Sequence, residues 1–298
     1  MYLNNPLRIV FFLNNRGMLN WMPDKAFLKL YYRMAIGKRL NLKSPQGFNE
    51  KLQWLKLYDR KPIYTTMVDK YEAKKYVADT IGEEYIIPTL GIYDSFDEIN
   101  FDELPSQFVL KCTHDSGGIV ICKDKSKLDL EKARQKINKS LKKNYYYQGR
   151  EWPYMNIKPR IIAEKYMCDD NNPDLLDYKL MCFNTKVKCS FVCLDRYDET
   201  GLKVDFYDAQ WNKMPFMRKY SNSDRLTPKP ENYEKMVELS EKLSKDIAFV
   251  RVDFYEINGR LYFGELTFFP GSGNEKFDPI EWDYKLGGWL ELPKKNDA

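Results

Sequence analysis

A run near the C-terminus, RVDFYEINGRLYFGELTFFPGSG at residues 251–273, constrains the fold most, because it predicts a β-hairpin that turns at Asn258-Gly259. Both strands alternate apolar and polar residues. Each strand also carries a carboxylate, Asp253 on the first and Glu265 on the second, where a buried sheet would favour Val or Ile. The run therefore predicts a sheet with a polar site on it.

The length of the turn decides which face of the hairpin the two acids occupy. With a strict two-residue turn, Asp253 faces Gly264 and Glu265 points to the other side of the sheet, because opposed residues share a face. A three-residue loop at 258–260 instead places Asp253 opposite Glu265. We expect the three-residue loop, because it sorts most of the polar residues onto one side.

In that register Arg251 opposes Thr267, beside the two acids. Carboxylates that converge repel each other unless a cation lies between them, and oxygen donors of this kind suit magnesium. The pattern thus outlines a magnesium site made of Asp253, Glu265 and Thr267. The alternative is a solvent-facing strand with a surface ion pair between Arg251 and Asp253.

Composition excludes several other kinds of chemistry. The chain has 298 residues, whereas a domain with a single core usually has about 100 to 200 residues, so we expect more than one lobe. Its contents of 43% hydrophobic and 31% charged residues are typical of globular proteins. His114 is the single histidine, and the six cysteines show no C-x-x-C spacing, so imidazole or thiolate metal sites and a serine–histidine relay are disfavoured. Acid, base and metal chemistry must rest on carboxylates and lysines.

The charge pattern and hydropathy bear on partners and location. The formal net charge of +5 is spread along the chain, whereas nucleic-acid binders concentrate positive charge, so we expect no nucleic-acid partner. The apolar stretch at 7–13 is far shorter than the roughly 20 residues of a membrane helix. We therefore expect a cytoplasmic protein without an integral membrane segment, and a secretory signal is the competing interpretation.

Three further features carry weaker signals. Lys111 ends an apolar strand, where a buried ammonium needs an anion, and the small residues of THDSGG at 113–118 could close over phosphates. Glu164 follows an apolar strand and could accept a hydrogen bond from an amino group or a ribose hydroxyl. Lys70 lies at the start of a helix. The alternatives are a plain hairpin bend, a loop carboxylate and an exposed lysine.

The order of these features along the chain resembles the ATP-grasp superfamily over residues 65–273. The phrases FNEKLQWLK, FVLKCTHDSGG, PRIIAEKYM, DYKLMCF and GELTFFPGSG resemble its TupA-like branch, associated with bacterial surface polysaccharides and teichuronopeptide, over nearly the whole chain. One position departs from the superfamily pattern: Thr267 stands where a metal-binding asparagine is usual, which puts the second metal position in doubt.

The resemblance implies an α+β ATP-grasp fold, in which two α+β lobes hold ATP between them after a helical N-terminal segment. We expect four segments along the chain: a helical segment at 1–65, a helix and strand lobe at 66–105, an ATP-grasp lobe with a phosphate flap at 106–165, and a lobe with the metal-binding hairpin at 166–298.

The resemblance also implies a role for each site residue, with ATP and Mg²⁺ as cofactors. Cofactor binding is expected at Lys70, Lys111, Ser116, Gly117, Gly118 and Glu164, with Glu164 near the adenine. Magnesium is expected at Asp253 and Glu265, with Thr267 as a further ligand. Arg251 and Lys179 are the expected catalytic residues, and His114 could carry a proton or lie on the surface.

The implied function is an ATP-dependent carboxylate–amine ligase in surface-polysaccharide biosynthesis, acting on a small molecule or glycan with a carboxylate, with peripheral association with polysaccharide-assembly proteins. The alternatives are a sugar or glycan kinase, and a glycosyltransferase-associated ATP-binding protein. The chain shows no D-x-D motif for a glycosyltransferase; the nearest acidic pair is Asp169 and Asp170. A scaffold that has lost catalysis is a non-enzyme alternative.

Overall fold

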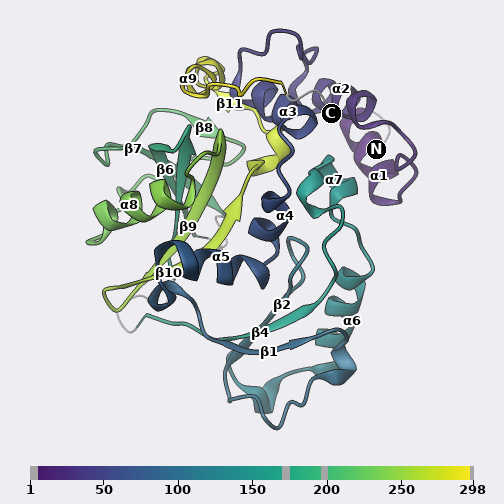
Figure 1. The fold of residues 1–298 in the computed structure, drawn as a ribbon, viewed down its shortest axis with the longest axis vertical. Helices are drawn as coiled ribbons and strands as arrows, with labels where there is room; N and C mark the ends of the chain where they lie inside the picture. Colours follow the sequence, from purple (N-terminus) through teal and green to yellow (C-terminus); the bar gives the residue numbers. More distant parts are fainter. Residues whose placement is uncertain (1–5, 170–174, 196–200, 296–298) are drawn as a thin grey trace.

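The computed structural model describes residues 6–169, 175–195 and 201–295. Two antiparallel sheets form the centres of its two lobes. One sheet has four strands in the order β1-β4-β2-β3, and the other has five in the order β10-β9-β5-β6-β7. Figure 1 shows the five-stranded sheet above the four-stranded sheet, with α4 and α5 beside the join. This arrangement confirms the α+β class and its two lobes.

The smaller lobe is built from the four-stranded sheet and one helix. Its elements are β1 (Thr89–Tyr93), β2 (Phe108–Cys112), β3 (Ile119–Cys122), α6 (Leu130–Leu141) and β4 (Ile161–Lys165). Alternate residues of β2, Phe108, Leu110 and Cys112, are fully buried in a core with Ile137 of α6. The residues between them, among them Lys111, therefore face the other lobe's side of the sheet.

The larger lobe carries the main hydrophobic core. Its strands are β5 (Asp177–Phe183), β6 (Lys186–Leu194), β7 (Lys203–Asp208), β9 (Phe249–Ile257) and β10 (Arg260–Thr267). Helix α8 (Tyr233–Leu243) packs on β5, β6 and β9 through Met236, Leu239 and Leu243. A two-stranded sheet of β8 (Met217–Arg218) and β11 (Phe277–Asp278) lies next to β7.

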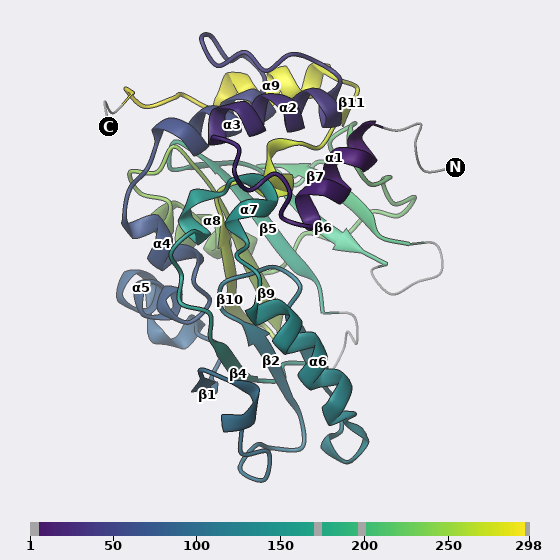
Figure 2. The ribbon, with the colours of Figure 1, turned by 90° about the vertical axis from the view of Figure 1, so that its right-hand side faces the viewer.

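The remaining helices surround the larger lobe. They are α1 (Pro6–Asn15), α2 (Asp24–Ile36), α3 (Phe48–Tyr58), α4 (Ile63–Val68), α5 (Glu72–Ile81), α7 (Tyr146–Gly149) and α9 (Glu281–Trp289). Figure 2 shows α1, α2, α3 and α9 together at the end far from the smaller lobe. None of the helices in the described ranges is both long and apolar enough to span a bilayer.

The cores do not follow the four expected segments closely. Helix α2 forms a small cluster around Phe27 and Tyr32, whereas Phe48 of α3 packs against Phe183 and Phe249 in the main core. Strand β1, from the expected 66–105 segment, pairs with β4 in the smaller sheet. The boundaries at 65, 105 and 165 remain a prediction, and the packing joins parts of neighbouring segments.

The hairpin of β9 and β10 corrects the expected turn. Arg260 pairs with Ile257, so the loop has two residues, and positive φ values of 49° at Asn258 and 72° at Gly259 are those of a type I′ turn. The three-residue loop was therefore wrong. The register shifts by one between Phe263 and Leu266, which is a β-bulge.

The bulge restores the register that matters for the site. Beyond it, Thr267 pairs with Arg251, as predicted. Both Gly264 and Glu265 then lie opposite Asp253, and a Cβ at Gly264 would come within 3.2 Å of the Asp253 carbonyl oxygen. A glycine here lets the two strands approach closely where the extra residue is accommodated.

Candidate functional site

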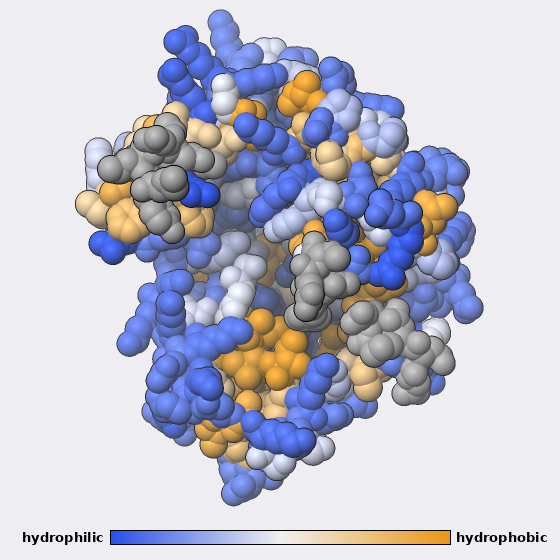
Figure 3. Space-filling view, turned by 180° about the vertical axis from the view of Figure 1, so that it is seen from behind, coloured by the Kyte–Doolittle hydropathy of each residue, from blue (hydrophilic) through white to orange (hydrophobic). Residues whose placement is uncertain are grey.

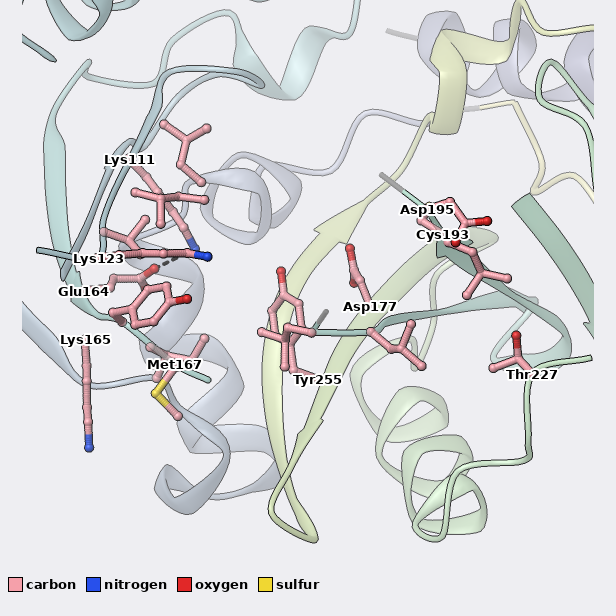
Figure 4. Close-up of a pocket in the computed structure, with 18 of the residues that line it drawn as sticks. Lys111, Lys123, Glu164, Lys165, Met167, Asp177, Cys193, Asp195, Thr227 and Tyr255 are labelled. Atoms are coloured by element: carbon pink, nitrogen blue, oxygen red, sulfur yellow. Dashed lines mark ion pairs between the residues drawn. The ribbon is translucent and has the colours of Figure 1, made fainter. Parts of the chain in front are cut away.

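A cavity of about 570 Å³ lies between the two sheets. Apolar residues of β2 and β3, Val109, Ile119 and Ile121, line one wall, and Asp177 and Tyr255 lie on the other. Figure 4 shows Lys111 and Glu164 on the first wall facing these two, and Figure 3 shows apolar surface of the smaller lobe beside the hollow. A mainly apolar cavity with a few charged groups is typical of a small-molecule site.

Glu164, on β4, holds two lysines in this wall. Its Oε2 lies 2.7 Å from Lys111 Nζ and its Oε1 lies 2.5 Å from Lys74 Nζ. Burial by itself raises the pKa of Glu164, but the two ammonium groups outweigh it and hold that pKa below its ordinary value. Both carboxylate oxygens are thus engaged by lysines, and the predicted contact of Glu164 with adenine remains a prediction.

Lys74 was missed from the sequence. It lies on α5, four residues after Lys70, and donates to the carbonyl oxygen of Ile87 at 2.7 Å as well as to Glu164. Lysines four apart share one face of a helix, so this spacing was the signal available. Lys70 itself lies just before α5, in the turn that leads into it.

The bend between β2 and β3 contacts Lys70 directly. The Lys70 backbone N–H donates to the Thr113 carbonyl oxygen at 3.0 Å, and its ammonium donates to the carbonyl oxygen of Asp115. Ser116 and Gly117 are exposed at the tip, where Gly117 has φ of +112° and open space around its Cα. Gly118 is buried. The exposed tip of the bend can therefore present backbone groups to a ligand.

Three polar atoms of this bend lack partners. Thr113 Oγ1, His114 Nδ1 and Asp115 Oδ1 are buried and make no hydrogen bond within the described part of the chain. His114 Nε2 lies 3.1 Å from the Lys143 carbonyl oxygen, and burial lowers the pKa of His114, so a neutral ring is favoured. Buried polar atoms without partners are uncommon, and these lie in the bend between β2 and β3.

The hairpin acids converge on one guanidinium. Arg251 Nε donates to Asp253 Oδ1 and Arg251 Nη2 donates to Asp253 Oδ2, both at 2.6 Å, and Nη2 also lies 2.6 Å from Glu265 Oε1. Thr267 Oγ1 donates to the same Glu265 oxygen at 3.4 Å. Asp253 is 1% exposed, whereas the Glu265 side chain is 45% exposed.

Lys179, on β5, completes this cluster. Its ammonium forms ion pairs with Asp253 and, at 2.5 Å, with Asp177. Burial alone lowers the pKa of Lys179, but Asp177 and Asp253 raise it above its ordinary value. The cationic form of Lys179 is therefore favoured, and it fixes the carboxylate of Asp253 from the side opposite the sheet's bulge.

The cluster sets the charge of Glu265. Burial alone raises the pKa of Glu265, yet Arg251, Lys179 and Lys70 outweigh it and lower that pKa to about 2. Lys70 lies in the turn before α5 and Glu265 lies on β10, and each of these charges affects the pKa of the other. Lys111 lies on the Lys70 side and interacts with it as a like charge.

The chemistry of the donors fits magnesium, with Arg251 now in the central position. Within the described ranges, no group of three or more His, Cys, Asp or Glu side chains has the arrangement of a metal site. Asp253 and Glu265 nevertheless converge on one cation, and carboxylate and hydroxyl oxygens are the donors that magnesium prefers. Arg251 occupies the position between the two acids, and magnesium binding by Asp253, Glu265 and Thr267 remains a prediction.

A second buried cluster adjoins the hairpin and was missed from the sequence. Lys56 of α3 is fully buried, and its ammonium lies 2.7 Å from the Gly149 carbonyl oxygen and 2.9 Å from that of Ser272. Burial lowers its pKa to about 8 although Glu151 raises it. Arg251 acts electrostatically on Glu151. The sequence did not indicate that Lys56 is buried, because a lysine in an amphipathic helix is usually exposed.

A comparison of the sequence with protein families shows the family of this chain. The sequence model of the TupA-like ATP-grasp family matches residues 50–291. This chain belongs to the TupA-like ATP-grasp family. The match covers both lobes and every predicted site residue, and it confirms the ATP-grasp fold. Among curated proteins, the chain has no significant match.

Solved structures with a related fold include ATP-grasp ligases. The D-alanine–D-alanine ligase from Helicobacter pylori is 18% identical, with 84% of this chain and 70% of that chain covered and a TM-score of 0.43. A RimK domain ATP-grasp protein from Sphaerobacter thermophilus is 10% identical, with coverages of 78% and 70% and a TM-score of 0.43. The ligase PsnB, in complex with a phosphomimetic variant of its minimal precursor, Mg and ADP, is 12% identical, with coverages of 86% and 65% and a TM-score of 0.42. The assignment of this TupA-like chain rests on the family match.

Asp170, half of the acidic pair considered for a glycosyltransferase, lies outside the described residues. Asp169 accepts a hydrogen bond of 2.8 Å from the backbone N–H of Asn258 at the hairpin tip. In this TupA-like protein, that contact gives Asp169 a structural role at the far end of the hairpin from Asp253.

Proposed function

We propose that this protein is an ATP- and Mg²⁺-dependent ligase that activates a substrate carboxylate as an acylphosphate and joins it to an amine or another nucleophile. The proposal rests on the hydrogen bonds of Arg251 to both Asp253 and Glu265. Lys70, from the turn before α5, interacts electrostatically with Glu265. The proposal is supported because acids that could hold a metal interact electrostatically with a lysine that could bind phosphate. Membership of the TupA-like ATP-grasp family supports the same reaction class.

ATP would lie along the cavity. The apolar wall of Val109 and Ile119 suits the adenine, and the backbone after Glu164, at 165–167, lines the same cavity and can hydrogen-bond its edge. Lys111 and Lys70 would contact the phosphates, and the bend with Ser116, Gly117 and Gly118 would cover them. Glu164 would then hold Lys111 in place, besides its predicted contact near the adenine.

Asp253, Glu265 and Thr267 would hold magnesium. When bound, this ion neutralises negative charge on the terminal phosphates during transfer. Burial raises the pKa of Asp253 to about 6, and Lys179, which pairs with Asp253 from β5, would act against that shift and orient the carboxylate. Arg251, released from the acids, can bind the transferred phosphoryl group, for which its planar fork of donors is suited.

The reaction proceeds in two displacements. A carboxylate oxygen bonds to the γ-phosphorus as the bond to the bridging oxygen breaks and ADP leaves. The amine nitrogen then attacks the acyl carbon, phosphate leaves with that carboxylate oxygen, and the amine gives up a proton. Arg251 and Lys179 supply positive charge where oxygen anions develop.

The biological setting belongs to this proposal as well. The association of the TupA-like branch with surface polysaccharides supports an acidic glycan or uronic acid as the carboxylate substrate. Such building blocks are made where ATP is available, which favours the cytoplasm and peripheral contact with polysaccharide-assembly proteins.

Mass spectrometry of products tests the proposal. The protein is incubated with ATP, magnesium, a panel of uronic acids carrying heavy oxygen in the carboxylate, and a panel of amines. We expect an amide and one heavy oxygen in the released phosphate. A stable sugar phosphate would identify a kinase instead, and ATP-independent or absent turnover would refute the ligase.

Asp253→Asn serves as the inactive variant in this assay. Asp79→Asn is the matched control, because Asp79 is an exposed acid on α5 that pairs with Lys75 alone among the described residues. We expect the control to form product at the normal rate.

A further inference from the structure

The burial of helix α1 is the reverse of the usual pattern. Its one buried side chain among 8–15 is polar: Asn14 is 5% exposed and its Nδ2 donates to the Gln148 carbonyl oxygen at 3.1 Å. Phe11 and Phe12, in contrast, are 51% and 52% exposed. A surface helix normally turns its apolar side chains to the core. This helix packs beside α2 and α7 and presents two aromatic rings outward.

The exposed apolar residues continue beyond the helix. Ile9, Met18 and Trp21 are 39%, 57% and 79% exposed, and the indole N–H of Trp21 donates to the Met18 carbonyl oxygen at 3.0 Å. We define the N-terminal face by the following residues: Arg8, Ile9, Phe11, Phe12, Arg16, Met18 and Trp21. Single exposed apolar residues are ordinary on a protein surface, whereas several bulky ones gathered in one short segment indicate a contact surface.

The charge of the N-terminal face has one sign. Residues 1–23 contain Arg8 and Arg16 and no Asp or Glu. Neither arginine forms an ion pair within the described ranges, and the guanidinium of Arg16 lies 4.3 Å from the centre of the Phe12 ring. Both positive charges are therefore available to an anionic surface.

A groove beside the N-terminal face is also lined by apolar and basic side chains. The groove, of about 1210 Å³, is lined by Phe11 and Phe12 on one side and by Lys219, Lys276 and Phe277 on the other. Its acids are Glu275 and Asp278. Glu275 already pairs with Lys219 at 3.0 Å and with Arg218 at 3.5 Å. Neighbouring elements thus leave the region positive overall.

We propose that the N-terminal face binds the surface of an anionic lipid bilayer. Phenylalanine and tryptophan side chains on a helix and its following turn, with arginines between them, suit the interface, where rings enter the acyl boundary and cations meet the lipid headgroups. The face lies at the end of the molecule away from β1 and β4 (Figures 1 and 2), so the smaller lobe stays clear of the bilayer. The proposal does not depend on the reaction.

Vesicle flotation tests the proposal with the whole chain. The probes are vesicles of phosphatidylcholine alone and vesicles in which a quarter of the lipid is phosphatidylglycerol. We expect the protein to float with the anionic vesicles, and Phe11→Asp/Phe12→Asp to weaken this at least about tenfold. Arg8→Gln/Arg16→Gln should weaken binding to the anionic vesicles by about tenfold, and high salt should cause the same loss.

Ile63→Asp/Leu130→Asp is the matched control. Ile63 and Leu130 are 45% and 46% exposed first residues of α4 and α6, where an aspartate is compatible with the helix. We expect this variant to float like the unchanged protein, and all variants to keep the same circular dichroism and melting temperature.

Three results would overturn the proposal. They are no flotation of the unchanged protein with anionic vesicles, unaltered flotation of Phe11→Asp/Phe12→Asp, and an equal loss in the control. Sedimentation provides a further check: a dimer that Phe11→Asp/Phe12→Asp disrupts, without vesicle binding by the unchanged protein, would show that the face joins two copies of this chain.

Discussion

Arg251 and Asp253, two positions apart on β9, are joined by two hydrogen bonds of 2.6 Å each. Residues at i and i+2 of a strand share a face, so this pairing is local to the strand. The bulge at Gly264 then brings Glu265 onto the same guanidinium.

Replacing Asp253 by Asn removes one negative charge and keeps the side-chain shape. We expect ATP turnover to fall by about a hundredfold or more, because a buried charge at the proposed magnesium position is lost. Circular dichroism should remain unchanged. Asp79→Asn should retain turnover. Normal turnover of Asp253→Asn would exclude the metal role.

Lys111→Met should raise the KM for ATP by about tenfold, because one charge-assisted contact to phosphate is lost. Lys74→Met should have a smaller effect on KM, since Lys74 acts through Glu164. In the double variant the two effects should be non-additive. Steady-state kinetics at varied ATP measures both, and strictly additive effects would show that Lys74 does not position Lys111.

Lys56→Met keeps the volume of a fully buried side chain but leaves the carbonyl oxygens of Gly149 and Ser272 without this donor. We expect the free energy of unfolding to fall by about 3 kcal/mol in urea titration. Lys75→Met is the control, because the Lys75 side chain is 80% exposed. Equal stabilities of the two variants would contradict a structural role for Lys56.

Glu265 makes stability depend on pH in a defined window. Its pKa is lowered to about 2 in the folded protein, so its contribution is complete above about pH 4.5 and is lost as the pH falls towards 2. The difference in unfolding free energy between the unchanged protein and Glu265→Gln should therefore shrink between those values. Urea titrations at several pH values measure it. A constant difference would show that Glu265 is not held ionised.

Gly264→Ala tests the bulge. The new Cβ would lie 3.2 Å from the Asp253 carbonyl oxygen and 3.3 Å from the Asp253 Cβ, so the strands must separate slightly. We expect turnover to fall by about tenfold or more through displacement of Asp253, with a stability loss of about 1 kcal/mol. Gly288→Ala in α9, where the added Cβ meets nothing within 4 Å, should leave turnover unchanged.

The sequence predicted the local structure around the candidate site residues better than their contacts. Strand alternation and the N-G turn placed Asp253 and Glu265 on one hairpin, because these signals are local. The loop length was wrong, since a bulge at Gly264 produces the same register at the acids as a longer turn. A lone glycine in a strand was the available hint.

Contacts between distant segments were not predictable in this way. Lys74, Lys56 and Glu151 meet their partners only after the lobes and helices pack, and their own neighbours in the sequence look like ordinary surface helix or loop. Glu164 is an example. Its position in the sequence predicted a free hydrogen-bond acceptor near adenine, whereas in the structure both of its carboxylate oxygens form ion pairs with lysines.

The position of Arg251 between two acids has a consequence for the order in which ligands arrive. Arg251 is an internal counter-ion for Asp253 and Glu265, so a lone divalent ion would meet carboxylates whose negative charge is already partly balanced. A bound nucleotide would offer phosphate oxygens to the Arg251 guanidinium, and Asp253 and Glu265 would then be available to hold a metal. We therefore expect free magnesium to associate weakly and the magnesium–nucleotide pair to enter together.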